Sequence, residues 1–212
     1  MDFHTLASTR RSIRKYAPDD IAPDEIVECI KTAVTAPSGC NSQCWKFVVV
    51  HDKAVMGALA EAVAAAMKRT AGELGLGEDA AYVDGKIRAT TFFARAPILV
   101  AVFMTGLDYY DARMEDAFKR AGRPAAAIME ALSYPDVLSI GAVIQNLLLA
   151  VHEKGYGACW MNEPVFAREE ISAILGATAD MKLMSFIPIG RPAYSPKGKT
   201  YKPIEEIVKI IG

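Results

Sequence analysis

The sequence predicts an α+β fold in which a mixed sheet is flanked by helices. Stretches with helical periodicity alternate with short runs of β-branched and aromatic residues, which is typical of a chain that builds both kinds of element. The intervals between them are irregular, so a regular doubly wound sheet is not expected. No repeat, low-complexity tract or linker divides the 212 residues, which predicts one domain spanning residues 1–212.

The first part of the chain predicts two helices. A short amphipathic helix is expected near residues 2–8, and a longer one over Ala22–Pro37, where Pro23 and the acids after it mark a helix start. The apolar residues of this second helix share one face at helical spacing. They are Ile26, Ile30, Ala33 and Val34.

Two buried strands and a helix are expected next. Trp45–His51 and Ala96–Met104 are dense in β-branched and aromatic residues and indicate strands, and an Ala-rich helix runs from about Lys53 to Thr70. Two stretches, Glu73–Asp79 and Thr105–Pro135, lack sustained periodicity. The second of these is where a mobile or inserted segment is expected.

Pro135–Gly155 gives the clearest helix signal, because it is apolar on nearly every side, opens with Pro and closes with Gly. Its uncharged part is shorter than the roughly 20 residues that a bilayer demands, so it predicts a buried central helix rather than a membrane span. A strand over Gly157–Met161, a helix over Ala167–Leu175 and a strand over Met181–Gly190 follow. A loop, Arg191–Pro203, leads to a short terminal element.

Composition and charge exclude several classes of protein. Hydrophobic residues make up 52% and charged residues 23%, which is ordinary for a globular chain. A formal net charge of −1 gives no overall field toward nucleic acid or an anionic membrane, and neither is expected as a partner. The N-terminus lacks the apolar core of a signal peptide. With four cysteines expected to be reduced thiols, this predicts a cytoplasmic protein.

The stretch "PSGCNSQCWKF", residues 37–47, raises the question of a metal or redox site. Cys40 and Cys44 lack two further ligands at close spacing, and Cys29 falls on an expected buried helix, so no metal site is predicted. Three residues separate the pair, whereas the usual redox motif has two. The loop does offer short polar groups around Gly39, where a backbone can approach a flat ligand closely.

The segment Thr9–Tyr16 carries a cluster of cations. Arg10, Arg11 and Arg14 with Ser12 place three guanidinium groups and a hydroxyl within five residues, a composition that suits bidentate binding of phosphate. A solvated basic turn is an equally good interpretation from spacing alone. An RNA- or phosphate-binding function is a further alternative, against which the near-neutral net charge argues.

Motifs of several enzyme classes are missing from the sequence. No Gly-x-Gly-x-x-Gly follows a strand, so no nicotinamide nucleotide is expected in a Rossmann crevice. There is neither a Gly-x-Ser-x-Gly elbow nor a His-Glu-x-x-His pair, and His4, His51 and His152 are far apart in the sequence. We expect these three histidines to be surface or structural residues.

In their order along the chain, the motifs resemble the flavin-dependent nitroreductase family. They are Arg-Arg-Ser-x-Arg, then Pro-Ser-Gly-x-Asn-x-Gln-x-Trp, then "SIGAVIQNLLLAVHEKGYGACWM", then "IPIGRP" followed by "GKTYKP". The resemblance covers nearly the whole chain. It implies a nitroreductase-like three-layer fold with a central, mostly antiparallel sheet, an intertwined homodimer and FMN in each of two interface sites. It also implies NAD(P)H as a transient reductant in a ping-pong cycle.

The resemblance also implies cofactor-binding residues. Arg10, Arg11 and Ser12 match the group near the FMN phosphate and ribityl chain, and Arg14 matches the basic residue at the pyrimidine edge. Ser38, Gly39, Asn41 and Gln43 match the loop that, from the partner subunit, lines the flavin ring and ribityl chain. The strand-end backbone facing the flavin N5 and O4 is matched by Met161, Asn162 and Glu163. The C-terminal phosphate side is matched by Gly190, Arg191 and Lys199.

Two positions depart from the family pattern. The family commonly has Pro where Cys44 stands, so the loop loses a rigid φ and gains a thiol. A second basic residue is often found where Tyr201 stands, which leaves Arg191 or Lys202 as the alternative phosphate contact. The answer to the question of the loop is thus that it cradles a flavin. Cys40 and Cys44 are expected to take no part, with a minor alternative that one of them tunes or reacts near the flavin.

The expected activity is reduction of nitroaromatics, quinones or related small acceptors, because the cofactor carries the chemistry and no side chain stands out as an acid or base. Arg14 is the expected electrostatic stabiliser of the reduced flavin, with no other catalytic residue. The acceptor pocket is expected around Thr105–Pro135, with helix packing as the alternative role for its aromatic residues. These are Phe103, Tyr109, Tyr110, Phe118 and Tyr134.

Two rival functions stay open at this point. Within the enzymes, the alternative is a specialised flavin enzyme, either a reductive dehalogenase or a dehydrogenase. Outside them, it is a non-catalytic flavin-binding module.

Overall fold

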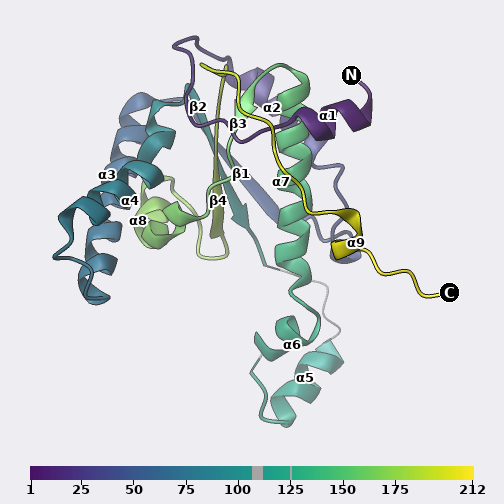
Figure 1. Cartoon of the computed structure of the whole chain (residues 1–212). Helices are drawn as coiled ribbons and strands as arrows, with labels where there is room; N and C mark the ends of the chain where they lie inside the picture. Colours follow the sequence, from purple (N-terminus) through teal and green to yellow (C-terminus); the bar gives the residue numbers. More distant parts are fainter. Residues whose placement is uncertain (107–111, 125) are drawn as a thin grey trace.

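A computed structural model describes residues 1–106, 112–124 and 126–212 and shows three layers with a sheet in the middle (Figure 1). The sheet of the described residues has the order β1-β2-β4-β3, and every neighbouring pair is antiparallel. The α+β class and the mostly antiparallel sheet are therefore confirmed. The strands are β1 (Trp45–Val50), β2 (Ile98–Met104), β3 (Gly157–Ala158) and β4 (Lys182–Gly190).

One face of the sheet packs against α2 (Pro23–Ala33) and α7 (Pro135–Glu153), with α1 (Phe3–Thr9) beside the end of α7 (Figure 1). Successive side chains of a strand point to opposite faces, so alternate residues of β2 enter this layer. Ile98, Val100 and Val102 are fully buried there with the apolar side of both helices.

The other face is covered by α3 (Lys53–Glu73), η2 (Phe92–Arg95) and α8 (Arg168–Ile174), with α4 (Ala80–Thr91) and η3 (Glu163–Ala167) packed on α3. The alternate residues of β2 point here and are fully buried. They are Leu99, Ala101 and Phe103. A sheet buried on both faces explains why β2 is apolar at every position.

The helix α7 is the central helix that the sequence predicts. In the described part of the chain it alone is long and apolar enough to cross a membrane, by length and composition only. Its buried side packs against the sheet and α2, as expected for the core helix of a globular fold. The residues of that side include Ile140, Val143, Ile144, Leu147 and Val151.

Several boundaries differ from those that the sequence predicts. The helix expected over Ala22–Pro37 ends at Ala33 and is followed by a turn. Helix α4 was not predicted, because its residues form only a weakly amphipathic pattern. The strand expected over Gly157–Met161 keeps two residues, Gly157 and Ala158, and Met161 pairs with Phe186 only as an isolated bridge in the same register.

The aperiodic stretch Thr105–Pro135 contains two short helices, α5 (Ala112–Arg120) and α6 (Ala126–Ala131), which lie beyond the N-terminal end of α7 (Figure 1). Past β4 the chain runs along the α7 side of the molecule to α9 (Ile204–Ile207). Residues 191–212 are exposed throughout. Their length thus contributes nothing to the core of this chain.

The segment Arg10–Tyr16 is laid across the ends of β3 and β4. Ser12 pairs with Ala158 as a parallel bridge, and Tyr16 with Pro192 as an antiparallel one. The close approach requires Gly157, because a Cβ atom there would lie 2.5 Å from Cγ1 and 2.7 Å from Cβ of Ile13. A side chain at this position would push the segment away from the sheet.

We expect Gly157→Ala to lower the free energy of unfolding by about 1–3 kcal/mol, because the methyl group overlaps the branched, buried side chain of Ile13. The measurement is urea unfolding followed by circular dichroism. Gly57→Ala is the control. Gly57 lies inside α3, and apart from the adjoining backbone of that helix no atom lies within 4 Å of the added methyl, so the change should raise stability by about 0.5–1 kcal/mol. Equal stability of Gly157→Ala and the parent chain would contradict the close approach.

Candidate functional site

The stretch Thr9–Tyr16, called the cationic segment from here on, is anchored by its one buried side chain. Ile13 is buried, and its N–H donates to the Ala158 carbonyl at 2.9 Å. Arg14 beside it is exposed, and Arg10, Arg11 and Ser12 are half-buried. The fold therefore holds the backbone of the segment against the sheet edge while its polar side chains remain at the surface.

Arg10 and Arg11 lie at the C-terminal end of α7. The Arg11 guanidinium donates to the carbonyls of Ser8 at 2.6 Å and Arg10 at 2.8 Å, just past the last turn of α1. The Thr9 hydroxyl lies 2.9 Å from Nε2 of His152 in the last turn of α7. Burial lowers the pKa of His152, and the charges of Arg10 and Arg11 lower it further. A half-buried imidazole thus lies in a positive field.

A buried thiol lies among these cations. Cys159 follows β3, and burial raises its pKa, while Arg14, a hydrogen bond with Ser12 and then Arg10 oppose that rise. This arrangement brings Arg10, Ser12 and Arg14 together around one point at the strand end. The sequence did not indicate Cys159, because a lone cysteine in an apolar run carries no signal of its neighbours.

Beyond Cys159 the chain turns at a hydrogen-bonded network. The Trp160 Nε1–H donates to Oδ1 of Asn162 and to Oγ of Ser185, both at 2.8 Å, and the Ser185 hydroxyl donates to the same Oδ1 at 2.7 Å. The Asn162 side-chain oxygen is therefore occupied internally. Its role in this structure is to fix the backbone that follows the strand.

The backbone amides at this turn differ in their availability. The Met161 N–H donates to the Phe186 carbonyl at 2.9 Å. Within the described ranges, no backbone carbonyl accepts from the N–H of Asn162 or Glu163. These two amides are thus donors that a ligand can satisfy, since a paired partner is the rule for such groups. The side chains of Arg14 and Glu163 line one cavity of about 550 Å³ beside them.

The loop with Ser38, Gly39, Asn41 and Gln43 is strained. Asn41 and Gln43 have φ of 56° and 47°, as does Cys40 with φ 51°, a region that non-glycine residues rarely adopt. The loop is held by the Gly39 N–H, which donates to Oγ of Ser139 at 3.1 Å, and by the Gln43 N–H, which donates to Oγ of Ser38 at 3.0 Å. Strain of this kind clusters at binding sites.

The loop and the cationic segment lie at opposite ends of α7. Ser139 is in the first turns of the helix and His152 is in the last. At a rise of 1.5 Å per residue, thirteen residues put these two points about 20 Å apart. One copy of the chain therefore does not bring the two groups of predicted site residues together.

The three residues expected on the C-terminal phosphate side, Gly190, Arg191 and Lys199, have different surroundings. Gly190 is buried, and a Cβ there would lie 2.7 Å from Cδ of Pro97 and Cδ1 of Tyr16, so its part in this structure is close packing. Arg191 stacks over the Tyr156 ring at 5.2 Å, and its carbonyl accepts from the Ala17 N–H at 2.8 Å. This places Arg191 beside the cationic segment.

The other residue of this group, Lys199, lies on the exposed tail, with its ammonium 5.1 Å from the ring of Tyr201. Tyr201 and Lys202 are exposed as well. The described contacts do not connect any of the three to the cationic segment.

The aromatic residues expected around an acceptor pocket have different surroundings. Phe103 is fully buried between the sheet and α3, so it does not line a pocket as expected. It is one of the residues of β2 that point toward α3. The Arg123 guanidinium lies over the ring of Phe118, 5.0 Å from its centroid. Tyr134 lines a cavity of about 350 Å³ with Asp136. Tyr109 and Tyr110 lie outside the described residues.

Fold and site together define an α+β protein in which a cationic segment, two unpaired strand-end amides and a strained loop are arranged around one core helix. The chain belongs to the nitroreductase family, whose pattern matches residues 7–191. The resemblance noted in the sequence is therefore confirmed.

Two curated relatives are iodotyrosine deiodinases. The protein of Thermotoga neapolitana is 27% identical over 209 residues, which are 97% of this chain and 96% of that protein. The protein of Daphnia pulex is 25% identical over 213 residues; the match covers 98% of this chain and 65% of the longer relative.

Two solved structures extend the comparison. A BluB-like flavoprotein from Clostridium difficile 630 superposes with a TM-score of 0.85 and 30% identity over the whole of both chains. An iodotyrosine deiodinase solved with FMN and 3-iodo-L-tyrosine gives a TM-score of 0.66 at 22% identity, over 94% of this chain and 95% of that one. The second likeness concerns the fold alone.

The lowered pKa of His152 predicts a pH dependence of stability. Because the unfolded state takes up the proton first, the free energy of unfolding should fall as pH decreases below about 6.5, the ordinary value of His. His152→Gln should reduce the difference in that free energy between pH 7.5 and pH 5.5, measured by urea unfolding. The exposed His4, changed to Gln, serves as the control. The same pH difference in His152→Gln and the parent chain would refute the assignment.

Proposed function

We propose that this protein is an FMN-dependent oxidoreductase that uses NAD(P)H in a ping-pong cycle to reduce nitroaromatics, quinones or related small acceptors, as a cytoplasmic homodimer of single-domain chains. The observation that carries the proposal is the convergence of Arg10, Ser12 and Arg14 with the unpaired amides of Asn162 and Glu163 at one strand end. Membership of the nitroreductase family and similarity to a flavoprotein at 30% identity support it.

The residues present fit FMN. Guanidinium groups and a hydroxyl suit its phosphate and ribityl chain, which assigns Arg10, Arg11 and Ser12 to that end, with Arg191 beside them. The amides of Asn162 and Glu163 would donate to the flavin ring, and Met161 would support them through its pairing with Phe186. Gly190 would act by close packing, and Lys199 would act from the exposed tail that follows Arg191.

A second copy of the chain would supply the loop with Ser38, Gly39, Asn41 and Gln43. The support is geometric, because this loop is about 20 Å from the cationic segment along α7. Apolar residues that suit an interface are exposed on α7 and on the tail. They include Leu138 on the helix and Ile204, Ile207, Ile210 and Ile211 on the tail.

When bound, FMN supplies the two-electron carrier between the nicotinamide and the acceptor. Arg14 would hold positive charge at the pyrimidine edge, where negative charge gathers on reduction. The strand-end amides would orient the ring, and the buried Cys159 beneath the segment would keep water from that side. No side chain is assigned a proton transfer, which agrees with broad acceptor use.

A second candidate function is reductive dehalogenation of a halogenated aromatic. The two iodotyrosine deiodinase relatives favour it, at 25–27% identity over 97–98% of the chain. A flavin-binding module without turnover is the remaining alternative.

The test of the proposed function is an anaerobic absorbance titration of the FMN-loaded protein with NADH and NADPH separately. Bleaching of the flavin band at one equivalent of nucleotide per site is expected. Flavin that binds but stays yellow with both nucleotides would refute NAD(P)H as the reductant. Reoxidation of the reduced protein by 3-iodo-L-tyrosine, but by neither a quinone nor a nitroaromatic, would select the dehalogenase.

Arg14→Ala should lower the midpoint potential of the bound flavin by roughly 30–60 mV, the equivalent of losing one hydrogen bond to a charged group. Xanthine oxidase titration with a reference dye measures this potential. Arg120→Ala, on α5 away from the strand end, is the charge-matched control. An unchanged potential with FMN still bound would remove Arg14 from this role.

A further inference from the structure

Two adjoining cavities form a cleft that starts at the strand-end site. The first, of about 550 Å³, is lined by Arg14 and Glu163 of that site and by Lys15, Tyr16, Arg88, Ala89, Phe92 and Arg95. The second, of about 460 Å³, continues past Arg95 over the start of α3. Arg95 lines both, and Tyr16 of the first is next to Ala17 of the second, so the two cavities adjoin at Arg95.

The cleft is strongly cationic although the chain is not. Five Lys and Arg side chains line it against two carboxylates, Asp20 and Glu163, whereas the formal net charge of the whole chain is −1. Charge of one sign gathered in a concave surface focuses the field there. This local excess is therefore a signal for an anionic ligand.

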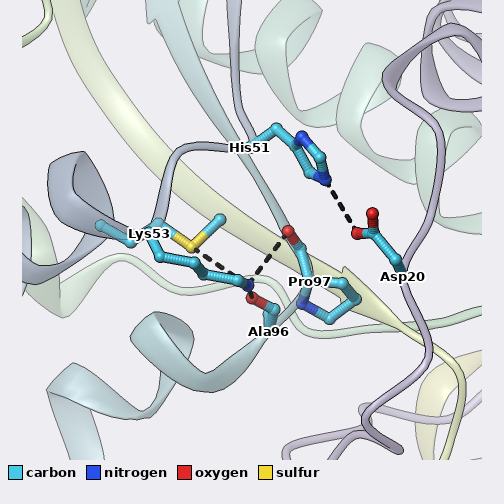
Figure 2. Close-up of polar contacts among 6 residues, drawn as sticks. Asp20, His51, Lys53, Ala96 and Pro97 are labelled. Atoms are coloured by element: carbon cyan, nitrogen blue, oxygen red, sulfur yellow. Dashed lines mark hydrogen bonds and ion pairs between the residues drawn. The ribbon is translucent and has the colours of Figure 1, made fainter.

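Some basic side chains of the cleft are engaged in contacts within the chain, and others form no ion pair in the described residues. In the outer part, the Lys53 ammonium donates to the carbonyls of Ala96 at 2.5 Å and Pro97 at 3.2 Å, and Nε2 of His51 lies 2.8 Å from Oδ1 of Asp20 (Figure 2). These contacts fix the N-terminal end of α3 against the start of β2. They leave Lys53 and His51 as part of the wall.

The guanidinium groups of Arg88 and Arg95 are available by contrast. Over the described ranges neither forms an ion pair, and both are exposed. Arg88 is in the last turn of α4, and Arg95 ends η2, whose Phe92 and Phe93 are buried in the core. Their backbones are thus held rigidly by packing, while their side chains reach into the cleft.

The chemistry of the pair selects a phosphate group. Guanidinium binds phosphate through two parallel hydrogen bonds, and an Arg is the residue that accommodates the 2′-phosphate of NADP in other folds. A nicotinamide nucleotide whose ring reaches the strand-end site can lay its remainder along the hollow that begins at Arg14 and Glu163. The cleft is such a hollow, and it presents Arg88 and Arg95 further along.

We propose that this cleft binds the adenosine 2′-phosphate of NADPH through Arg88 and Arg95, which makes NADPH the preferred reductant over NADH. The proposal rests on the proposed function, because it assigns the reductant of the same site. The phosphate group of FMN is the other phosphomonoester that Arg88 and Arg95 could bind. The experiment below separates the two.

The first measurement is calorimetric titration of the FMN-loaded protein with adenosine 2′,5′-bisphosphate and with 5′-AMP, which differ by the 2′-phosphate. The parent chain should bind the bisphosphate roughly 10–100-fold more tightly, the range expected for a charge-assisted hydrogen bond. Arg95→Gln and Arg88→Gln should each reduce that ratio about tenfold. Lys68→Gln, an exposed charge on α3 outside the cleft, should leave it unchanged.

The second measurement is the ratio of kcat/KM for NADPH to kcat/KM for NADH. It should exceed one in the parent chain and fall about tenfold in Arg95→Gln, and added salt should lower it as well. Fluorescence titration of the apoprotein gives the FMN affinity of each variant. It should be unaffected by Arg95→Gln.

The outcomes are distinct. Equal binding of the two adenosine phosphates by the parent chain would overturn the proposal, and so would a loss of FMN affinity in Arg95→Gln, which would assign the cleft to the flavin phosphate. If neither NADH nor NADPH reduces the flavin, the proposed function fails. The calorimetric ratio still reports on the cleft in that case, because it needs no turnover.

Discussion

The packing of Ile13 against Gly157 is the contact on which the arrangement of the site depends. Burial of an isoleucine side chain contributes roughly 1.5–3 kcal/mol, and here it fixes the one segment that carries three arginines within five residues. Gly157 has no side chain, so the backbone of β3 and Ile13 come within hydrogen-bonding distance at 2.9 Å. The cationic groups are therefore positioned by an apolar contact rather than by ion pairs.

The helix α7 keeps two parts of the candidate site apart. Its two ends hold different parts of the site: the strained loop is tied to Ser139 and the cationic segment to His152. A rigid rod of this length keeps the parts apart within one chain and presents an apolar, partly exposed flank. The same element thus forms the core of the fold and sets the geometry that a second copy would have to match.

The sequence predicted the elements whose signals are local, and missed those that depend on contacts distant in sequence. The apolar run of β2 and the Pro-to-Gly helix α7 were predicted within a few residues. Helix α4 was missed because its weak pattern is stabilised by packing on α3. Phe103 was placed at a pocket because an aromatic beside an aperiodic stretch does not show which face of a strand it occupies.

The same distinction holds for the candidate site. The cationic segment and the loop were recognisable as motifs, whereas the surroundings of Cys159 and the hydrogen-bonded side-chain oxygen of Asn162 were not. Both arise where β3 ends and β4 pairs across it. Arg88 and Arg95 were also missed, because six residues separate them in the sequence and only the turn from α4 through η2 aims both into one cleft.

The buried thiol of Cys159 has an electrostatic consequence. Burial raises its pKa, so at neutral pH the sulfur is uncharged although Arg10 and Arg14 lie nearby. A carboxylate at this point would neutralise those guanidinium groups and close the strand end into an internal ion pair. An uncharged, polarisable sulfur fills the same space without cancelling any charge. The Glu163 carboxylate is then the acidic group that acts on this point, and the positive charge of Arg10 and Arg14 stays available to an anion that approaches from solvent.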